Sequence, residues 1–412
     1  MIIKKFLLLI LILPLLVLSC GKGGGQIPAG KYRAILKTAG GDLPFFFEIT
    51  NDDKGNIGAS LLNGKETIKI NNVNIVDDSL IMYLPSFNST IKVEVSGSLL
   101  KGNLTLVKAN AVLQVIPLKA ELNTNYRFFI KPQNNIDVTG RWSAVFKEDD
   151  GSTYPAIGEF NQNGSELTGT FLTTTGDYRY LQGQVKDSTI YLSTFDGGHG
   201  YLFKATLDKN NKLVGGYWSG IKYHESWTAV KDEKAKLPDP DKLTFLKKGY
   251  TKFDFSFPDL KGQMVSLSDK KYQGRVVIVS LAGSWCPNCH DEARFLSPFY
   301  ERYHNEGLEI ICLMFENYID TARAVNQIKK FRDEFKINFD LLLAGTNDKD
   351  LASKKFPMLN KVLAFPTTIF IDRKGRVRKI NTGFSGPGTG DHYVHLTDEF
   401  TNFAEKLLNE RQ

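Results

Sequence analysis

Two cysteines three residues apart, Cys286 and Cys289, have the residue type and spacing best suited to chemistry in this 412-residue chain. They enclose Pro287-Asn288 and follow an apolar run, Val276 to Leu281. A helix is predicted to begin at the motif. The first thiol would then lie at a helix N-terminus, where free N–H groups and the helix dipole favour the thiolate. Cys286 is therefore predicted to be the nucleophile of thiol–disulfide exchange, and Cys289 the thiol that resolves the mixed disulfide.

The same residues match a second motif, because Cys286 to His290 has the CxxCH pattern of c-type haem attachment. Against this alternative, the motif ends a predicted β-strand, and no Met stands out as a second axial ligand. His290 is instead expected to be an exposed residue of the first helical turn, whose protonated form would stabilise a nearby thiolate. His392 and His395 are conceivable metal ligands together with it, although such His pairs in polar segments are usually solvated.

Zinc and peroxide chemistry fit the pair less well. Zinc would need two further ligands, and Cys312 lies in an apolar run, where it is predicted to be a small buried hydrophobe. A peroxiredoxin site needs Pro and Thr or Ser upstream of a lone reactive Cys, and Val279 and Gly283 stand there instead. No metal and no other cofactor is therefore predicted.

Four segments carry a resemblance that extends beyond the pair: Phe255–Gly262, Val265–Ser268, Trp285–Cys289 and Phe365–Asp372. Together they resemble the tethered TlpA/ResA-like thiol:disulfide oxidoreductases of the thioredoxin superfamily, from about Thr251 to the C-terminus. The resemblance implies a C-terminal α/β thioredoxin-like fold, a central mixed sheet flanked by helices. It also implies an enzyme that reduces disulfides of substrate proteins, and a membrane-bound thiol donor that re-reduces the pair.

The resemblance also implies roles for residues outside the pair. Pro366 would follow a cis peptide bond and pack opposite the two sulfurs, which makes it part of the catalytic site. The backbone beside it, at Phe365, would pair with the substrate chain, and Trp285 would contact the substrate as well. These three residues therefore complete the predicted substrate-facing side of the site.

The sequence departs from the family pattern in three places. Ser280 stands where thioredoxin has a buried acid, so the catalytic proton must be accepted elsewhere. Glu292 is the candidate acceptor, with Glu316 as a weaker one. Arg294 replaces a proline that usually kinks the helix, so a straighter helix is expected, and an extra segment, Ala344–Leu359, is expected to form a lid or a longer helix.

The elements that must position the pair follow an α/β order. An apolar run before the motif and helical stretches after it alternate through the last third of the chain, and this alternation is typical of a sheet covered by helices. The predicted strands are 276–281, 308–314, 339–343, 367–371 and 376–380, and the predicted helices are about 289–304, 322–335 and 397–409.

The preceding region, from residue 30 to about 230, has short Thr-, Val- and aromatic-rich runs broken by Gly, Asn and Asp, a pattern typical of strands and turns. Two motifs recur about a hundred residues apart. Gly30–Ala34 resembles Gly140–Ala144, and Val76–Ser79 resembles Val185–Ser188. An all-β region of two repeats is therefore predicted, as two small barrels or sandwiches or as halves of a larger one.

The N-terminus has the features of a bacterial lipoprotein signal. Lys4 and Lys5 precede a short apolar run that ends at Val17–Cys20, which resembles a lipobox. Cys20 is the predicted lipid anchor, followed by a Gly-rich tether. The chain is therefore expected in the bacterial cell envelope, bound to a membrane through the anchor and facing the periplasm.

The predicted organisation has six parts. These are a signal peptide (1–20), a tether (21–29), two β-rich repeats (30–135 and 136–230), a charged linker (231–249) and a thioredoxin-like domain (250–412). With a formal net charge of +7 and no long basic run, no nucleic-acid binding is predicted. One alternative of another class stays open: a binding or assembly lipoprotein in which the β repeats carry the function and the redox domain is auxiliary.

Overall fold

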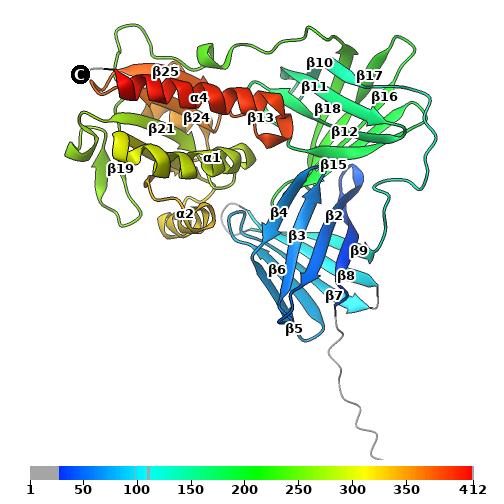
Figure 1. Ribbon diagram of the computed structural model, residues 1–412. Coiled ribbons are helices and arrows are strands. Elements are labelled where there is room, and N and C mark those ends of the chain that lie inside the picture. The colour runs from blue at the N-terminus through cyan, green and yellow to red at the C-terminus, as the bar shows by residue number, and fades with distance from the viewer. Residues whose placement is uncertain (1–26, 97, 109–111, 411–412) are drawn as a thin grey trace, which may run out of the picture.

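The computed structural model describes residues 27–96, 98–108 and 112–410. The predicted signal peptide, Cys20 and most of the tether lie outside these residues. Within them, two strand-rich units precede a unit of mixed strands and helices (Figure 1). No helix in the described ranges is long and apolar enough to cross a membrane.

The first unit, here called the N-terminal sheet, is an antiparallel meander in the order β4-β3-β2-β1-β9-β8-β7-β6-β5. Alternate residues of β1 are buried, which places Tyr32, Ala34 and Leu36 in its core. Its strands are β1 (Gly30–Thr38), β2 (Gly41–Asn51), β3 (Ile57–Asn63), β4 (Glu66–Ile70), β5 (Asn72–Val76), β6 (Ser79–Leu84), β7 (Ser89–Ser96), β8 (Leu99–Val107) and β9 (Leu113–Leu122).

The second unit is a closed barrel. Its order is β11-β10-β18-β17-β16-β15-β14-β12-β13, and a β11–β12 pairing joins the two ends of the sheet. Aromatic side chains fill its interior, among them Phe146, Phe171 and Trp227. Its strands are β10 (Gly140–Lys147), β11 (Thr153–Asn163), β12 (Glu166–Thr173), β13 (Gly176–Asp177), β14 (Leu181–Lys186), β15 (Thr189–Phe195), β16 (Gly200–Leu207), β17 (Lys212–Ser219) and β18 (Tyr223–Lys231).

The two units share details of construction. Gly30 and Gly140 open the first strand of each unit with positive φ, and β1 pairs with β9 as β10 pairs with β18. The other recurring motif lies at a two-residue hairpin turn in each unit, where Asp77 and Asp187 adopt φ of 54° and 53°. The motifs that suggested a repeat thus occupy corresponding places in two sheets of the same meander order.

Buried polar contacts join the N-terminal sheet to the barrel. The guanidinium of Arg127, between the two units, donates from Nε to Ser193 Oγ at 2.9 Å, and that hydroxyl donates to Pro44 O at 2.6 Å. Asn63 Nδ2 donates to Phe195 O at 2.8 Å. Because these groups are buried, separating the two units would leave them without partners, which disfavours separation.

The third unit has a five-stranded mixed sheet in the order β23-β22-β21-β24-β25, in which β21, β22 and β23 are parallel to one another. Every residue of β21 and β22 is buried, as expected for central strands covered on both faces. The elements are β19 (Ser256–Pro258), β20 (Met264–Ser266), β21 (Val276–Ala282), α1 (Pro287–Tyr303), β22 (Leu308–Glu316), α2 (Thr321–Phe335), β23 (Asp340–Thr346), α3 (Lys349–Lys355), β24 (Thr367–Ile371), β25 (Val377–Thr382) and α4 (Asp391–Asn409).

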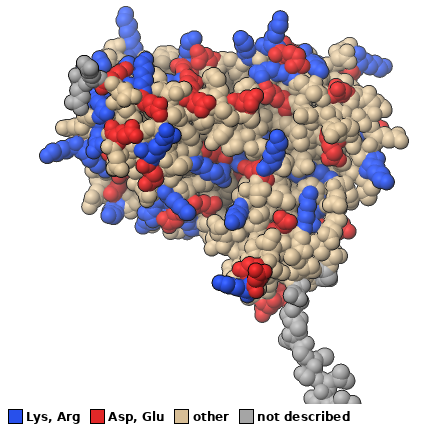
Figure 2. All heavy atoms as spheres, in the orientation of Figure 1, with Lys and Arg blue, Asp and Glu red and all other residues tan. Residues whose placement is uncertain are grey.

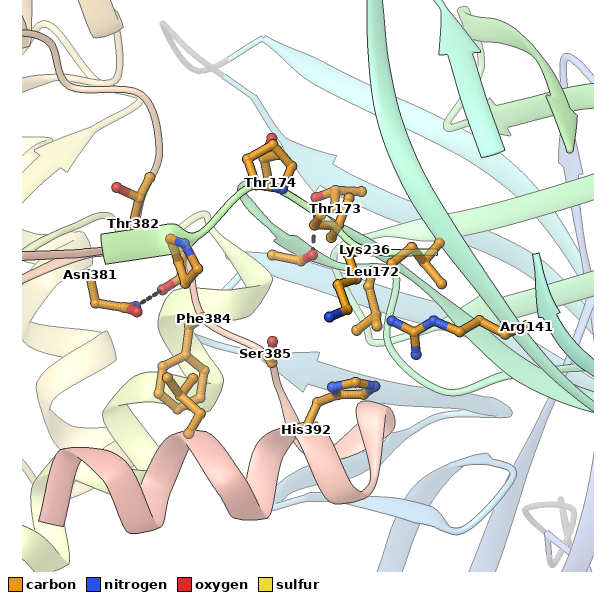
Figure 3. Close-up of a pocket in the computed structure, with 17 residues that line it drawn as sticks. Arg141, Leu172, Thr173, Thr174, Lys236, Asn381, Thr382, Phe384, Ser385 and His392 are labelled. Atoms are coloured by element: carbon orange, nitrogen blue, oxygen red, sulfur yellow. Dashed lines mark hydrogen bonds between the residues drawn. The ribbon is translucent and has the colours of Figure 1, made fainter. Parts of the chain in front are cut away.

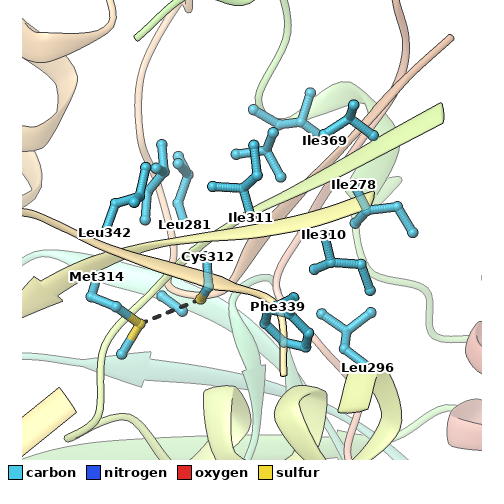
Figure 4. Packing of buried hydrophobic residues seen from close by; sticks show 14 of the residues in the cluster. Ile278, Leu281, Leu296, Ile310, Ile311, Cys312, Met314, Phe339, Leu342 and Ile369 are labelled. Atoms are coloured by element: carbon cyan, nitrogen blue, oxygen red, sulfur yellow. Dashed lines mark hydrogen bonds between the residues drawn. The ribbon is translucent and has the colours of Figure 1, made fainter. Parts of the chain in front are cut away.

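This order of strands and helices is the thioredoxin-like fold that the sequence predicted. Its core brings aliphatic side chains of β21, β22 and α1 together, for example Ile278, Ile310 and Leu296 (Figure 4). Cys312 belongs to the same core and lies 3.4 Å from the sulfur of Met314. The prediction that Cys312 is a small buried hydrophobe is therefore confirmed.

Two expectations concerned local details. Helix α1 contains Pro298, which has no N–H to donate to the Arg294 carbonyl one turn earlier, so a proline lies four residues after Arg294. That the helix is straighter than in the family stays a prediction. The segment 344–359 is neither a lid nor a longer helix. It completes β23, forms the short α3 and ends with Phe356 buried in the core.

Candidate active site

The two cysteines lie at the N-terminus of α1. Cys286 is the N-cap residue, and its Sγ accepts a hydrogen bond from the backbone N–H of Cys289 at 3.2 Å. The Cys286 thiol in turn donates to the carbonyl oxygen of Phe365 at 3.1 Å. Both thiols are free and buried. Cys286 thus lies between the N-terminus of α1 and the loop before β24.

The Phe365–Pro366 peptide bond is cis, in agreement with the expectation for Pro366. The ring of Trp285 meets the edge of the Phe365 ring at a centroid distance of 6.0 Å, and its indole N–H donates to Phe315 O at 2.8 Å. The structure therefore brings Trp285, Phe365 and Pro366 together around Cys286.

Glu292 is buried beneath the pair and held by two strands. Its carboxylate accepts hydrogen bonds from Ser280 Oγ on β21 at 2.6 Å and from Thr368 Oγ1 on β24 at 2.5 Å. Burial raises the pKa of Glu292 to about 7. A carboxyl group with this pKa can gain and lose a proton near neutral pH, as a proton carrier must.

The pKa of Cys289 is also raised. Burial first, and then its interactions with Cys286 and with the charge of Glu292, raise the pKa of Cys289 well above its ordinary value. The neutral thiol is therefore the resting form of Cys289, and it must lose a proton before it can attack a disulfide. Glu292 lies close enough to influence that proton, whereas Ser280, in the position of the usual acid, only orients Glu292.

Glu316 is a second buried carboxyl group with a pKa raised to about 7 by burial. It accepts from the backbone N–H of Ser284 at 2.9 Å and from its hydroxyl at 2.6 Å. Both bonds fix the turn that leads into Trp285. The contacts of Glu316 are thus those of a residue that positions the turn before the pair.

His290 differs from its prediction, because it is 1% exposed. Its ring stacks on Phe87 of the N-terminal sheet at 4.1 Å, and Nε2 is hydrogen-bonded to Ser284 O at 2.7 Å. Burial lowers the pKa of His290 well below its usual value, so the ring stays neutral. The expectation of an exposed, protonatable histidine was wrong because the sequence gives no sign of the distant strand loop that covers it.

The remaining metal candidates are not gathered at the pair. His392 Nε2 lies 3.0 Å from Glu159 of the barrel, and His395 is exposed on α4. Within the described ranges, no group of three or more His, Cys, Asp or Glu side chains is placed to hold a metal ion.

A sequence profile of the AhpC/TSA family matches residues 249–380. The thiol-disulfide oxidoreductase ResA of Geobacillus kaustophilus is 30% identical over 135 residues, which are 33% of this chain and 69% of that protein. The chain belongs to the ResA-like thiol-disulfide oxidoreductases. Another relative, the thioredoxin-like protein YneN of Bacillus subtilis, is 27% identical over 130 residues, 32% of this chain and 68% of its own length.

We call the third unit, which contains the pair, the ResA-like domain. Solved structures are also similar to part of this chain. A thiol:disulfide interchange protein of the thioredoxin family from Chlorobium tepidum aligns with a TM-score of 0.30 and 15% identity, over 40% of this chain and 99% of that one. A secreted thiol-disulfide isomerase from Corynebacterium glutamicum aligns with a TM-score of 0.31 and 20% identity, over 43% and 97% of the two chains.

The barrel contacts the ResA-like domain at the motif itself. Asn288, between the two cysteines, donates to Asp177 Oδ2 at 3.0 Å, and the N–H of Gly386 donates to the same oxygen at 2.6 Å. Gly176 is so close that a Cβ there would stand 2.4 Å from Asn288 Oδ1. Burial, together with the charge of Asp291, raises the pKa of Asp177 to about 6.

Arg179 links all three units next to this contact. Its guanidinium is 3% exposed and pairs with Asp291 of α1 at 3.0 Å and with Glu66 of the N-terminal sheet. Asp196 of the barrel lies 3.9 Å from Nε. Sequence reasoning missed Asp177 and Arg179, because a charged residue in a β-turn region is ordinarily solvated and nothing local reveals a partner a hundred residues away.

A cavity of about 300 Å³ lies between the barrel, the linker and the loop after β25 (Figure 3). Arg141, Lys236 and His392 lie around it, and Asn381 and Phe384 line its other side. The loop at this cavity also holds the site, since the N–H of Gly383 donates to Pro366 O at 2.9 Å. The barrel thus borders the cis-proline loop as well as the CxxC motif.

Proposed function

We propose that this protein reduces disulfide bonds in substrate proteins, with Cys286 as nucleophile and Cys289 as resolving thiol. The observation that carries the proposal is the pair at the N-terminus of α1, with Cys286 Sγ 3.1 Å from the carbonyl oxygen next to the cis Pro366. Phe365 and Trp285 would contact the substrate chain there. The direction, reduction rather than oxidation, is supported by the likeness to ResA-type proteins.

The reaction proceeds in two exchanges. The Cys286 thiolate attacks one sulfur of the substrate disulfide, the S–S bond breaks, and the first substrate sulfur leaves as a thiolate that takes up a proton. Cys289 then gives its proton to the Glu292 carboxylate and attacks Cys286 Sγ. The second substrate sulfur leaves and is protonated. Two electrons pass to the substrate, and a Cys286–Cys289 disulfide remains.

We further propose that the chain works in the bacterial cell envelope, facing the periplasm. Support comes from the signal-like sequence that ends at Cys20, where a lipid would anchor the protein to a membrane. An oxidised pair must be reduced again for a second turnover, so a membrane-bound thiol donor is part of this proposal.

A redox titration tests the function. The protein is equilibrated in dithiothreitol buffers of graded potential, its thiols are alkylated, and the intact mass gives the fraction reduced. A reversible two-thiol step near −270 mV, about the potential of thioredoxin, is the expected result for a reductase. A step near about −120 mV would make the protein an oxidant instead. A covalent haem in the mass, with no thiol step, would replace the proposal by the CxxCH alternative.

A further inference from the structure

A polar cavity of about 370 Å³ lies where the barrel faces the CxxC motif. We call it the tyrosine pocket. It reaches the motif at Asn288, so a molecule bound there is next to the catalytic loop. Its barrel wall includes Tyr154, Tyr178, Tyr201, Tyr223 and Glu225.

The hydroxyl groups of this wall are organised around one buried carboxylate. Tyr154 donates to Glu225 Oε2 at 2.5 Å, Tyr223 donates to the other oxygen, and the Tyr154 and Tyr178 hydroxyls are 2.7 Å apart. Burial and the bond to Glu225 raise the pKa of Tyr154, so the phenol keeps its proton. The hydroxyl protons of Tyr154 and Tyr223 are donated to Glu225. The remaining lone pairs on these phenol oxygens can therefore accept hydrogen bonds from a ligand.

Tyr201 makes the pocket incomplete. Its side chain is 8% exposed and lines the cavity, yet its hydroxyl forms no hydrogen bond with any residue that the structure describes. Because Tyr201 lines the cavity, a molecule bound there can supply the missing partner. Burial raises the pKa of Tyr201 well above its usual value, so the phenol keeps its proton.

The charge of the pocket favours a cation. Its described lining contains three carboxyl groups, Glu148, Asp177 and Glu225, and one ammonium group, Lys349. Burial and the charge of Glu225 raise the pKa of Glu148, whereas Lys349 lowers it, so a lysine ammonium already acts at this rim. On the face shown in Figure 2, positive and negative side chains are interspersed.

We propose that the tyrosine pocket binds the cationic group of a disulfide substrate, an ammonium or guanidinium close to the S–S bond, and directs that bond to Cys286. The inference rests on the proposed exchange reaction and names the substrate class for it. The cation donates hydrogen bonds to the pocket's oxygen atoms, and the Tyr201 hydroxyl donates to a substrate acceptor. Such a group occurs in small diamine disulfides and in polypeptides with Lys or Arg beside the cysteine.

Small disulfides of different charge test the proposal on the full chain. The reduced protein is mixed near pH 7 with cystamine (two ammonium groups), 2-hydroxyethyl disulfide (neutral) or 3,3′-dithiodipropionate (two carboxylates), and loss of both thiols is followed. Each rate is divided by the rate at which the same disulfide oxidises dithiothreitol. We expect this corrected rate to be about tenfold or more higher for cystamine than for the neutral compound, and lowest for the dianion.

Variants connect the preference to the pocket. In Tyr201→Phe and Glu148→Gln the cystamine-to-neutral ratio should fall several-fold. Tyr191→Phe, on the neighbouring strand β15 and packed on Phe129 outside the pocket, should keep both the ratio and the basal rate. A ratio near one in the unaltered protein, or a ratio unchanged in both pocket variants, would overturn the inference. Failure of all three disulfides to oxidise the pair would instead overturn the proposed function.

A second pair of probes distinguishes small diamine disulfides from basic polypeptides as the source of the cation. Two peptide disulfides that differ only in Lys or Gln beside the cysteine are compared in the same assay. A preference for the Lys peptide assigns the pocket to basic polypeptide segments. A preference that is confined to cystamine assigns it to small diamine disulfides.

Discussion

The two sides of the Cys286–Cys289 pair are built differently. On the inner side, Glu292 lies beneath Cys289, and both of its oxygens accept hydroxyl groups from strands of the ResA-like domain. On the outer side, Asn288 contacts Asp177 of the barrel, and Arg179 joins the barrel to the N-terminal sheet and α1. The inner side is therefore complete within one domain, whereas the outer side exists only when three units are assembled.

This difference separates two tasks. A base held by two strands of its own domain can serve the proton transfer whatever the barrel does. Cys286 is 4% exposed in this arrangement, so we expect the outer contacts to limit what can reach it. Changes on the inner side should therefore alter rates and pH dependence, and changes on the outer side should alter access.

The largest expected effect comes from Cys289→Ser. The first exchange remains possible, but nothing resolves the mixed disulfide, so turnover should fall by about a thousandfold or more and a Cys286–substrate adduct should accumulate. Intact mass after addition of a small disulfide detects the adduct. Cys312→Ser is the matched control, because that thiol lies in the core of β22, and its turnover should stay near that of the unaltered protein. An equal loss of turnover in Cys312→Ser would contradict the assignment of Cys289 as the resolving thiol.

Glu292→Gln should have the next largest effect. Without the carboxylate Cys289 loses its proton acceptor, so the rate of the second exchange should fall by about a hundredfold. In the unaltered protein, the rate of the second exchange should rise as the pH increases through about 7, the pKa of Glu292. In the variant this rise should be absent. Stopped-flow resolution of the adduct across pH 5 to 9 measures both.

Glu316→Gln is the comparison for this prediction. Glu316 has the same pKa, about 7, and equal burial, but its two hydrogen bonds go to Ser284 rather than to the strands beneath Cys289. We expect the rate of the second exchange in this variant to rise near pH 7, as in the unaltered protein. If the rise near pH 7 were absent in Glu316→Gln and present in Glu292→Gln, Glu316 would be the proton acceptor instead of Glu292.

The sequence predicted the inner side better than the outer side. Cys286, Cys289 and Glu292 follow one another within two helical turns, so their spacing places them together. The position of Pro366 opposite the pair was instead implied by the family resemblance. The continuous apolar runs likewise predicted the central strands. The hydroxyl partner of Glu292 at Thr368 is 76 residues away, and only the antiparallel register of β21 with β24 brings it there.

The outer side had no local signal. Asp177 and Arg179 lie in a polar turn region, where such residues are usually solvated. Their burial depends on where the barrel lies against the ResA-like domain, and a strand pattern with a period of two residues says nothing about how two units pack. His290 failed as a prediction for the same reason, because Phe87, which covers it, belongs to the N-terminal sheet.

The inner carboxyl groups should also affect stability. The folded-state pKa values of Glu292 and Glu316, about 7, lie above the ordinary value of 4.5. The folded state therefore binds these protons more tightly. Their contribution to the free energy of unfolding is greatest below pH 4.5 and is lost as pH rises through about 7, by about 2 kcal/mol for each group between pH 5 and 8. Urea unfolding should show this loss, and Glu292→Gln should reduce it. An unchanged pH dependence would contradict the burial argument.

The smallest expected effect is on the outer side, in Arg179→Met. Removing the guanidinium leaves the buried Glu66 carboxylate without its cation and Asp291 with Arg294 alone, which disfavours the assembled arrangement. The alkylation rate of Cys286 by iodoacetamide should rise several-fold. Arg332→Met is the control, since its partner Asp333 is exposed at the surface and such pairs contribute little. Glu66→Gln, which removes one partner only, should give a smaller rise. If both interface variants react like the control, the barrel does not limit access, and the outer side must act only by binding substrate.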